Sequence, residues 1–287
     1  MKRRTWIGWL FALPAALHLV VFALLPILVA VGISFTKWNL IKGDPRFVGG
    51  QNFQRIFSDG DFLNALKNTA LYALLSVPLG TIAALAVALL VVQKVKGLAL
   101  FRTLFYLQSV CNQVAIAMIW IYIFLPKTGM INTILGGKEI DYLNTPNLAL
   151  LALVFMSIWT GLGPRMVLFM SGILNIPDTL YEAAELDGAG SAQRFWRITL
   201  PLLAPTSLFV VVTSTIGAMQ VFTPVYMMTK GGPDGTTDVV GYHIYSAAWE
   251  RFQMGEASAM SVILFALIFA ISALLYRAMN RQVEGMS

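Results

Sequence analysis

Few residues in this chain have the types and spacing that catalysis requires. The sequence contains one cysteine, Cys111, and two histidines, His18 and His243, which lie far apart in the chain. A disulfide framework and a cysteine-based zinc or iron–sulfur site are therefore excluded, and a histidine metal centre is disfavoured. We expect no catalytic residues, no metal ion and no cofactor, and the chain is predicted not to be an enzyme.

The residues that would cradle ATP are also missing. A phosphate-binding loop needs two glycines separated by four residues, then Lys and then Ser or Thr. The nearest fragment is Gly137-Lys138, but it is followed by Glu139, and Asn132 stands where the first glycine would be. Any work that the protein does must therefore draw its energy from a partner or from an ion gradient.

The composition indicates where such work would take place. Of the 287 residues, 57% are hydrophobic and 12% are charged, against about 25% charged in an ordinary soluble domain. A soluble protein could not cover its surface with so few charges, and a disordered chain needs the opposite balance. The net charge of +6 and the pI near 9.5 are typical of basic cytoplasmic loops in a membrane protein. We expect a multi-pass membrane protein that contacts lipid and not nucleic acid.

Six stretches free of Asp, Glu, Lys and Arg are long enough to cross a bilayer, which takes about 20 apolar residues in a helix. Only helices and closed barrels satisfy every backbone polar group in lipid, and these stretches lack the alternation of barrel strands. The predicted fold is therefore all-α, a single transmembrane domain over residues 1–287. Its expected spans are 6–35, 69–92, 103–126, 143–174, 201–228 and 257–276.

Both ends of the chain should lie on one side of the membrane, because the number of spans is even. If that side is the cytoplasm, Lys and Arg are about twice as dense in the inside segments as in the outside loops, as the positive-inside rule asks. The predicted topology therefore has cytoplasmic termini. Its outside loops are 36–67, 127–141 and 230–256, and its inside loops are 94–102 and a much longer one that starts at residue 175.

The long loop of residues 175–200 has a regular local design. Pro177 and Asp178 are helix-start signals, and Thr179 and Glu182 stand at the spacing of a capping box, so a short helix is predicted to begin here. Gly188 follows as a stop that can take the left-handed conformation, and Ser191 is a candidate N-cap for a second short helix. The sequence predicts a rigid helix–turn–helix, which is either a well-capped surface loop or a docking element for a cytoplasmic partner.

The same loop carries the motif Glu-Ala-Ala, three residues, Gly, nine residues, Ile-x-Leu-Pro. With this motif the chain resembles the membrane permease subunits of ATP-binding-cassette (ABC) importers. The run Tyr-Glu-Ala-Ala-Glu-Leu-Asp-Gly-Ala-Gly and the Gly-Gly-Pro loop at 228–248 resemble the carbohydrate-uptake, maltose-type branch. The resemblance covers about residues 60–280 and implies the type I importer (MetI-like) architecture. The residues that it assigns to ATPase coupling are Glu182, Ala183, Ala184, Asp187, Gly188, Ile198, Leu200 and Pro201.

The resemblance also implies a function and a set of partners. The chain would form half of the translocation pore for a sugar, oligosaccharide or polyol. It would pair with a second, non-identical permease, two copies of an ATPase and an extracytoplasmic binding protein, in the plasma (inner) membrane of a bacterium or archaeon. A glycerol-phosphate importer permease and a passive facilitator or channel remain alternatives. A proton- or sodium-coupled carrier usually needs carboxylates within the membrane, and the six stretches contain none.

In maltose-type permeases the spans on either side of this loop line the substrate pocket, so the resemblance places candidate contacts by position. Ser214 matches a polar contact, whereas Pro164 replaces an aromatic residue and Ala218 and Val221 replace amides. The maltose site is thus not reproduced, and the substrate differs or binds mainly in the partner permease. The predicted substrate-path residues are Thr160, Gly161, Pro164, Ser214, Ala218, Gln220 and Val221.

Arg165 is the lone charge inside a predicted span. Charges at membrane depth are costly and mark functional contacts by default, but a long basic side chain near the end of a span can also reach the lipid headgroups. The sequence leaves both interpretations open. Helical spacing further predicts that Ser214, Ala218 and Val221 share one stripe that faces the pathway, with Gln220 at its flank.

Overall fold

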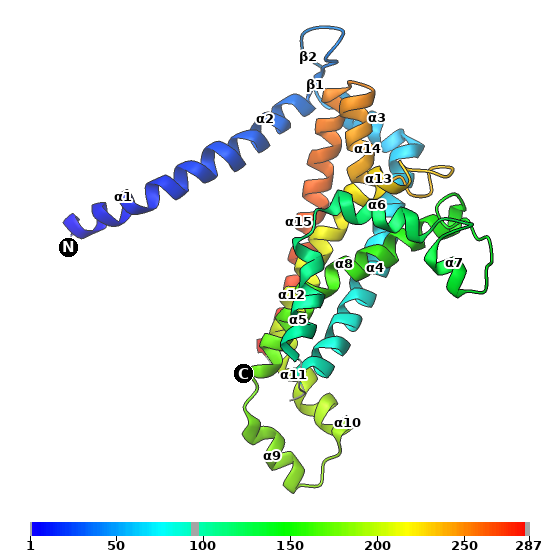
Figure 1. Ribbon diagram of the computed structural model, residues 1–287. Helices are drawn as coiled ribbons and strands as arrows, with labels where there is room; N and C mark the ends of the chain where they lie inside the picture. The colour runs from blue at the N-terminus through cyan, green and yellow to red at the C-terminus, as the bar shows by residue number, and fades with distance from the viewer. Residues whose placement is uncertain (1, 93–97, 285–287) are drawn as a thin grey trace. The chain divides into compact units, whose positions relative to one another are not determined.

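The computed structural model describes residues 2–92 and 98–284. The chain divides into two compact units, one made of residues 1–62 and 243–266 and the other of residues 63–242 and 267–287. Figure 1 labels the helices and strands of both units.

The first unit begins with a long apolar helix, and a small antiparallel hairpin follows it. In the hairpin Thr36 pairs with Phe47, and Lys37 with Arg46. The elements of the unit are α1 (Lys2–Leu19), a π-helical turn (Val20–Leu24), α2 (Leu25–Ser34), β1 (Thr36–Lys37), β2 (Arg46–Phe47), α3 (Gln51–Ser58), the end of α14 (Val240–Tyr245), a second π-helical turn (Ser246–Glu250) and the first part of α15 (Met254–Glu284).

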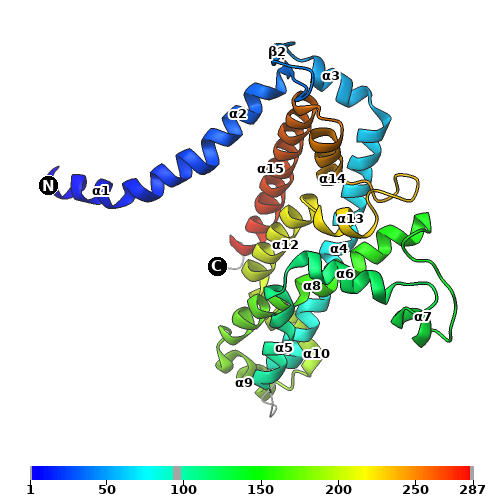
Figure 2. The ribbon, with the colours of Figure 1, turned by 45° about the horizontal axis from the view of Figure 1, so that its top comes forward.

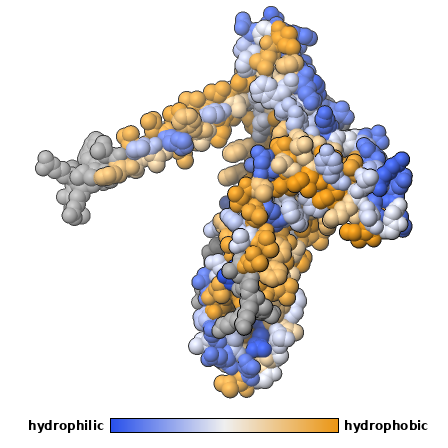
Figure 3. All heavy atoms as spheres, viewed as in Figure 1, coloured by the Kyte–Doolittle hydropathy of each residue, from blue (hydrophilic) through white to orange (hydrophobic). Residues whose placement is uncertain are grey.

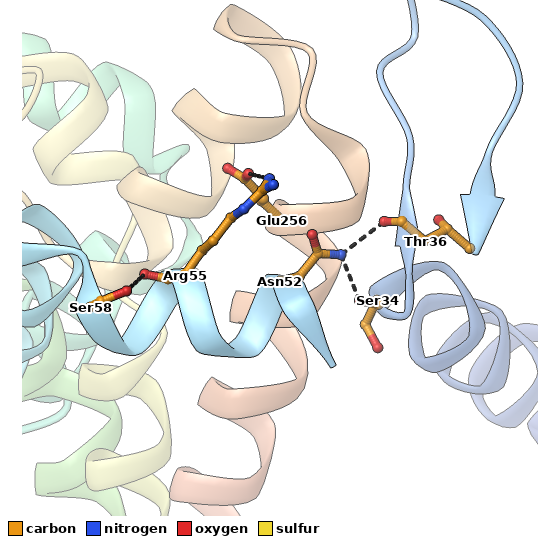
Figure 4. A network of polar contacts seen from close by, with 6 residues as sticks. All are labelled: Ser34, Thr36, Asn52, Arg55, Ser58 and Glu256. Carbon is orange, nitrogen blue, oxygen red and sulfur yellow. Dashed lines mark hydrogen bonds and ion pairs between the residues drawn. The ribbon is translucent and has the colours of Figure 1, made fainter. Parts of the chain in front are cut away.

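A buried asparagine ties α3 to the end of α2 (Figure 4). The Asn52 side-chain nitrogen donates hydrogen bonds to the backbone oxygens of Ser34 and Thr36, both at 2.8 Å, and the residue is only 1% exposed. The last carbonyls of a helix have no partner within the helix, so Asn52 satisfies groups that the fold would otherwise leave open. Arg55, one turn further along α3, forms an ion pair with Glu256 of α15 at 3.4 Å.

Replacing Asn52 by leucine should destabilise this unit. The buried Ser34 carbonyl and the partly buried Thr36 carbonyl would lose their donor, and a buried polar group left without a partner costs about 1–3 kcal/mol. We expect a lower midpoint of thermal unfolding for Asn52→Leu in detergent. Gln54→Leu, an exposed position on the same helix, is the matched control and should leave the midpoint unchanged. Equal midpoints for both variants would contradict the assigned role of Asn52.

The second unit is a bundle of long and short helices. Its elements are the main part of α4 (Gly60–Val92), α5 (Leu98–Val110), α6 (Gln113–Ile123), α7 (Met130–Ile134), α8 (Pro146–Leu174), α9 (Asp178–Leu186), α10 (Ser191–Arg194), a π-helical turn (Phe195–Thr199), α11 (Leu200–Leu202), α12 (Ala204–Met219), α13 (Thr223–Met228) and the start of α14. Helix α8 packs against α5 and α12, and α6 packs against α13, as Figure 2 also shows.

Two clusters of buried apolar side chains hold this bundle together. One joins Trp120 of α6 to Leu153 and Met156 of α8. The other joins α4 to α8, and here Ala84 and Ala88 are fully buried against the larger side chains of α8. Small residues at a helix interface allow close backbone approach in a membrane protein. Helices α4 and α8 therefore form a fixed frame for the groups between them.

The apolar surface follows the helices. On the face in Figure 3, hydrophobic residues cover the middle of the second unit, and hydrophilic residues gather around α7 and around α9 and α10. By length and composition, four described helices could cross a membrane: Phe11–Ser34, Gly60–Val92, Pro146–Leu174 and Met254–Met279. The all-helical prediction is thus confirmed, apart from the two-stranded hairpin.

The two remaining predicted spans are not straight helices. Leu100–Val110 and Gln113–Ile123 are bent by 103°, and Ser191–Leu202 and Ala204–Met219 by 65°. Six spans result if each bent pair counts as one. The predicted span 201–228 is also interrupted further on, because α12 ends at Met219 and α13 begins at Thr223.

Local chemistry explains the break before α6 and the break before α13. The Asn112 side chain accepts a hydrogen bond from the backbone nitrogen of Val114 at 2.8 Å and so caps the start of α6. Pro224 stands in the first turn of α13, where its missing N–H leaves no hydrogen bond unmade. An apolar run with a helix-starting residue inside it can therefore hold two helices.

Candidate functional site

A cavity of about 580 Å³ lies within the second unit, between α4, the α5–α6 bend, α8, α12 and the segment after α12. All seven predicted substrate-path residues line it: Thr160, Gly161 and Pro164 from α8, Ser214 and Ala218 from α12, and Gln220 and Val221 beyond it. The structure thus brings together two stretches about 50 residues apart in the sequence. Their role in transport stays a prediction.

The predicted helical stripe is only partly correct. Ser214 and Ala218 are both buried on α12, one turn apart, as expected. The helix ends at Met219, however, so Gln220 and Val221 do not follow its periodicity. Gln220 is exposed and lines the cavity together with the other residues.

Helices α4 and α5 contribute cavity residues that the sequence did not single out. Tyr72 and Ser76 of α4 and Gln108 of α5 line the cavity, and all three are buried. A polar or phenolic side chain inside an apolar run could have marked these positions. The sequence of an apolar helix does not tell, however, which of its sides faces a cavity and which faces its neighbours. Cys111, at the bend between α5 and α6, also lines the cavity.

Arg165 extends across the bundle from α8 to α12. Its Nε donates a hydrogen bond to the Ser214 hydroxyl at 3.0 Å, and the residue forms part of the cavity wall. Of the two interpretations that the sequence left open, the structure argues against the headgroup contact, since the guanidinium is held within the bundle.

The second candidate site is the loop that carries the Glu-Ala-Ala motif. Helix α9 ends at Leu186, and Gly188 follows with φ +77°, as the sequence predicts. The Gly188 nitrogen donates to the Glu185 oxygen at 3.0 Å, and the Ala189 nitrogen donates to the Ala184 oxygen at 2.8 Å. This pair of bonds is the Schellman motif, which closes a helix with a left-handed residue.

The two helix starts agree with the sequence prediction only in part. Pro177 precedes the first residue of α9, so Thr179 lies inside the helix and no capping box forms. Gly190, not Ser191, is the N-cap of α10. Proline has its dihedral angle preset and needs no N–H donor at this position, so α9 starts at the predicted signals Pro177 and Asp178, two residues before the start that a Thr179 cap would give.

The loop is attached to the bundle through a few contacts. The Tyr181 hydroxyl and the Thr199 hydroxyl are 2.9 Å apart and hydrogen-bonded. Tyr181 and Ile198 also pack against the cluster between α4 and α8. Glu185 and Arg194 form an ion pair at 3.3 Å, although a surface pair of this kind contributes only about 0–1 kcal/mol.

The outer surface of the loop is apolar as well as charged. Leu186 is 90% exposed and Trp196 is 65% exposed. The two residues lie on either side of Gly188 in the sequence. The other exposed residues of the motif region are Glu182, Ala183, Asp187 and Gly188 itself. Exposed large apolar side chains beside acidic ones are typical of a surface that docks against another protein.

The comparisons with known proteins agree with this geometry. Residues 76–285 match the family described as "Binding-protein-dependent transport system inner membrane component". The probable ABC transporter permease protein YesP of Bacillus subtilis is 36% identical over 285 residues, which cover 96% of this chain and 91% of YesP. The probable starch degradation products transport system permease protein AmyD of Thermoanaerobacterium thermosulfurigenes is 32% identical, with 96% and 95% covered.

Two further comparisons bear on the class and the fold. The sn-glycerol-3-phosphate transport system permease protein UgpA of Agrobacterium fabrum is 31% identical, over 96% of this chain and 95% of UgpA. A chain in the crystal structure of a bacterial ABC transporter for the acidic polysaccharide alginate superposes with a TM-score of 0.84, at 23% identity over 97% and 96% of the two chains. The predicted type I importer architecture is thereby confirmed. The chain belongs to the family of binding-protein-dependent transport system inner membrane components, the permease subunits of ABC importers.

Proposed function

We propose that this chain is one half of the translocation pathway of an ATP-driven importer for a sugar, oligosaccharide or polyol. A second, non-identical permease would supply the other half, two copies of an ATPase would power it, and an extracytoplasmic binding protein would deliver the solute. The chain ends would be cytoplasmic. The sugar class rests on relatives such as AmyD, whose name refers to starch degradation products.

The cavity is the observation that carries this proposal. It lies between helices long and apolar enough to span a membrane, and its wall combines hydroxyl, amide and aromatic side chains, among them Ser76, Thr160, Gln220 and Tyr72. A few placed polar groups in an otherwise apolar cleft are what fix the orientation of a small hydroxylated ligand. A packed helix interface would have left no such volume.

The exposed Glu-Ala-Ala loop supports the ATPase partner. The sequence contains no phosphate-binding loop, so ATP must bind to another subunit. The exposed Leu186 and the acidic Glu182 on α9 offer that subunit an apolar contact with a charged rim. Asp178, in the first turn of α9, is also favourable with respect to the helix dipole.

A glycerol phosphate is the second candidate substrate. The relative UgpA transports sn-glycerol-3-phosphate by its name, and the cavity wall of this chain includes the cationic Arg165. A phosphorylated polyol has both the hydroxyl groups and the charge that such a wall can bind.

The chain should be inactive alone and active in the complex. Purified chain in liposomes should neither hydrolyse ATP nor take up solute, since it holds no nucleotide site and only half of a pathway. Co-expressed with its partner permease and ATPase, it should co-purify with both and support ATP-dependent uptake from the loaded binding protein. Uptake by the chain without its partners would instead support a facilitator or channel.

A further inference from the structure

Arg165 is a positive charge that this chain does not neutralise. Within residues 2–92 and 98–284, no carboxylate lies within ion-pair distance of its guanidinium, because the two ion pairs there join other residues. Its one hydrogen bond goes to the neutral Ser214 hydroxyl. The Nη1 atom is buried and has no hydrogen-bond partner among those residues.

The fold nevertheless makes room for this cation. A side chain on Gly80 of α4 would overlap the Arg165 Nη1 atom, and a Cβ on Gly161 of α8 would lie 2.8 Å from its guanidinium carbon. The guanidinium therefore lies against two glycines and bonds to a third helix, α12. Its position is set by the bundle, and the side chain does not extend freely toward a lipid headgroup.

The rest of the cavity wall does not balance this charge. The lining residues include hydroxyl, amide, thiol, aromatic and aliphatic side chains but no Asp or Glu. An unpaired charge within a membrane protein is costly, and such residues face cavities or pathways where a partner can reach them. The charge raises the affinity of the cavity for anions, because attraction between charges is much stronger there than in water.

We propose that the cavity selects solutes that carry a negative charge, a carboxylate or a phosphate, and that Arg165 is the residue that binds this charge. A guanidinium nitrogen donates charge-assisted hydrogen bonds to either anion. Ser214 holds the guanidinium through Nε and Nη1 is buried against Gly80, so Nη2 is the nitrogen left for the solute. The inference rests on the proposed importer function, and it narrows the solute from any sugar or polyol to an acidic one.

Equilibrium binding to the assembled importer tests this proposal. The complex of both permeases and the ATPase would be placed in nanodiscs and titrated with two anionic probes, trigalacturonate and sn-glycerol 3-phosphate. Their neutral counterparts are galactotriose and glycerol. We expect one anionic probe to bind at least about tenfold more tightly than its counterpart, a difference of ~1.4 kcal/mol. Which probe does so distinguishes a carboxylate from a phosphate.

The variants locate the source of the preference. Arg165→Gln should abolish it, and Arg165→Lys should retain part of it, because lysine keeps the charge but not the planar fork. Arg46→Gln makes the same substitution at an exposed position on β2 and should leave the preference intact. If Arg165→Gln does not assemble, the proposal is tested by the difference in affinity between anionic and neutral probes, measured on the wild-type complex and on the Arg165→Lys complex.

Several results would overturn the proposal. They are binding of neither anionic probe, equal affinity for charged and neutral probes, and a preference that survives Arg165→Gln. One combined result has its own meaning. If the wild-type complex binds charged and neutral probes equally and the Arg165→Gln chain no longer associates with the second permease, the guanidinium pairs with an acidic residue of that permease. In all these cases ATP-driven import by the wild-type complex would still support the proposed function, whereas its absence would count against that function.

Discussion

Gly217→Trp is expected to reduce solute uptake by the assembled importer to near background. Gly217 lies on α12 and lines the cavity, and a Cβ at this position would meet no atom within 4 Å. A side chain can therefore start there without a clash at its Cβ, and an indole would occupy cavity space that the solute needs. Removing a glycine from a helix interior also favours the helix, by about 1 kcal/mol at most, so misfolding is not the expected cause of the loss.

The control introduces the same large side chain in place of a small one, at a position away from the cavity. Ala270→Trp lies on an exposed part of α15 and should support normal uptake at matched expression. ATP hydrolysis distinguishes a blocked cavity from a complex that has lost its ATPase. A blocked cavity leaves the ATPase bound, so its basal hydrolysis stays measurable. Normal uptake through Gly217→Trp would place the pathway outside this cavity.

Gly188→Val should uncouple ATP hydrolysis from transport. Gly188 has φ +77°, and a Cβ there would meet nothing within 4 Å, so the effect is purely one of backbone conformation. The left-handed conformation costs a residue with a side chain about 1–2 kcal/mol, more where the side chain is β-branched. The Schellman bonds of Ala189 and Gly188 would weaken, and the exposed end of α9 would lose its fixed position. We expect strongly reduced solute-stimulated ATP hydrolysis with the membrane helices still inserted.

A second glycine in the same loop provides the matched control. Gly190 also has open space around a Cβ, but its φ is −67°, a conformation that valine adopts readily. Gly190→Val should therefore retain coupling. If Gly188→Val keeps normal subunit stoichiometry and normal stimulated hydrolysis, the loop does not transmit force to or from the ATPase.

Hydrophobic runs predict where the helices lie but not where they bend. The runs at 143–174 and 257–276 correspond to single helices, because nothing inside them starts a new one. The runs at 103–126 and 201–228 break, and the cause is local: Asn112 caps a new helix, and Pro224 begins another. Both signals are present in the sequence, but uncharged residues inside an apolar run do not interrupt a search for charge-free stretches.

In the candidate sites, too, the sequence predicts some features, and others depend on how the helices pack. The Gly188 turn was predictable, because a glycine after a run of helix formers has a strong local preference. The cavity residues of α8 and α12 were predicted from their positions in the sequence relative to the Glu-Ala-Ala motif. Tyr72 and Ser76 were not predictable, because the side of α4 that faces the cavity is set by packing on α8. The choice between a headgroup contact and a cavity contact for Arg165 depended on Gly80 and Ser214, which are distant in sequence.

Chemical modification of Cys111 tests most directly whether the cavity is the transport pathway. Cys111 is the chain's only cysteine, it is exposed, and it lines the cavity. The rate of its reaction with a membrane-impermeant thiol reagent would be followed on this subunit's gel band in the assembled importer. We predict that transported solute slows the reaction and that ATP-driven cycling changes its rate. An unchanged rate, in a complex that imports the same solute, would contradict the assignment of this cavity to the pathway.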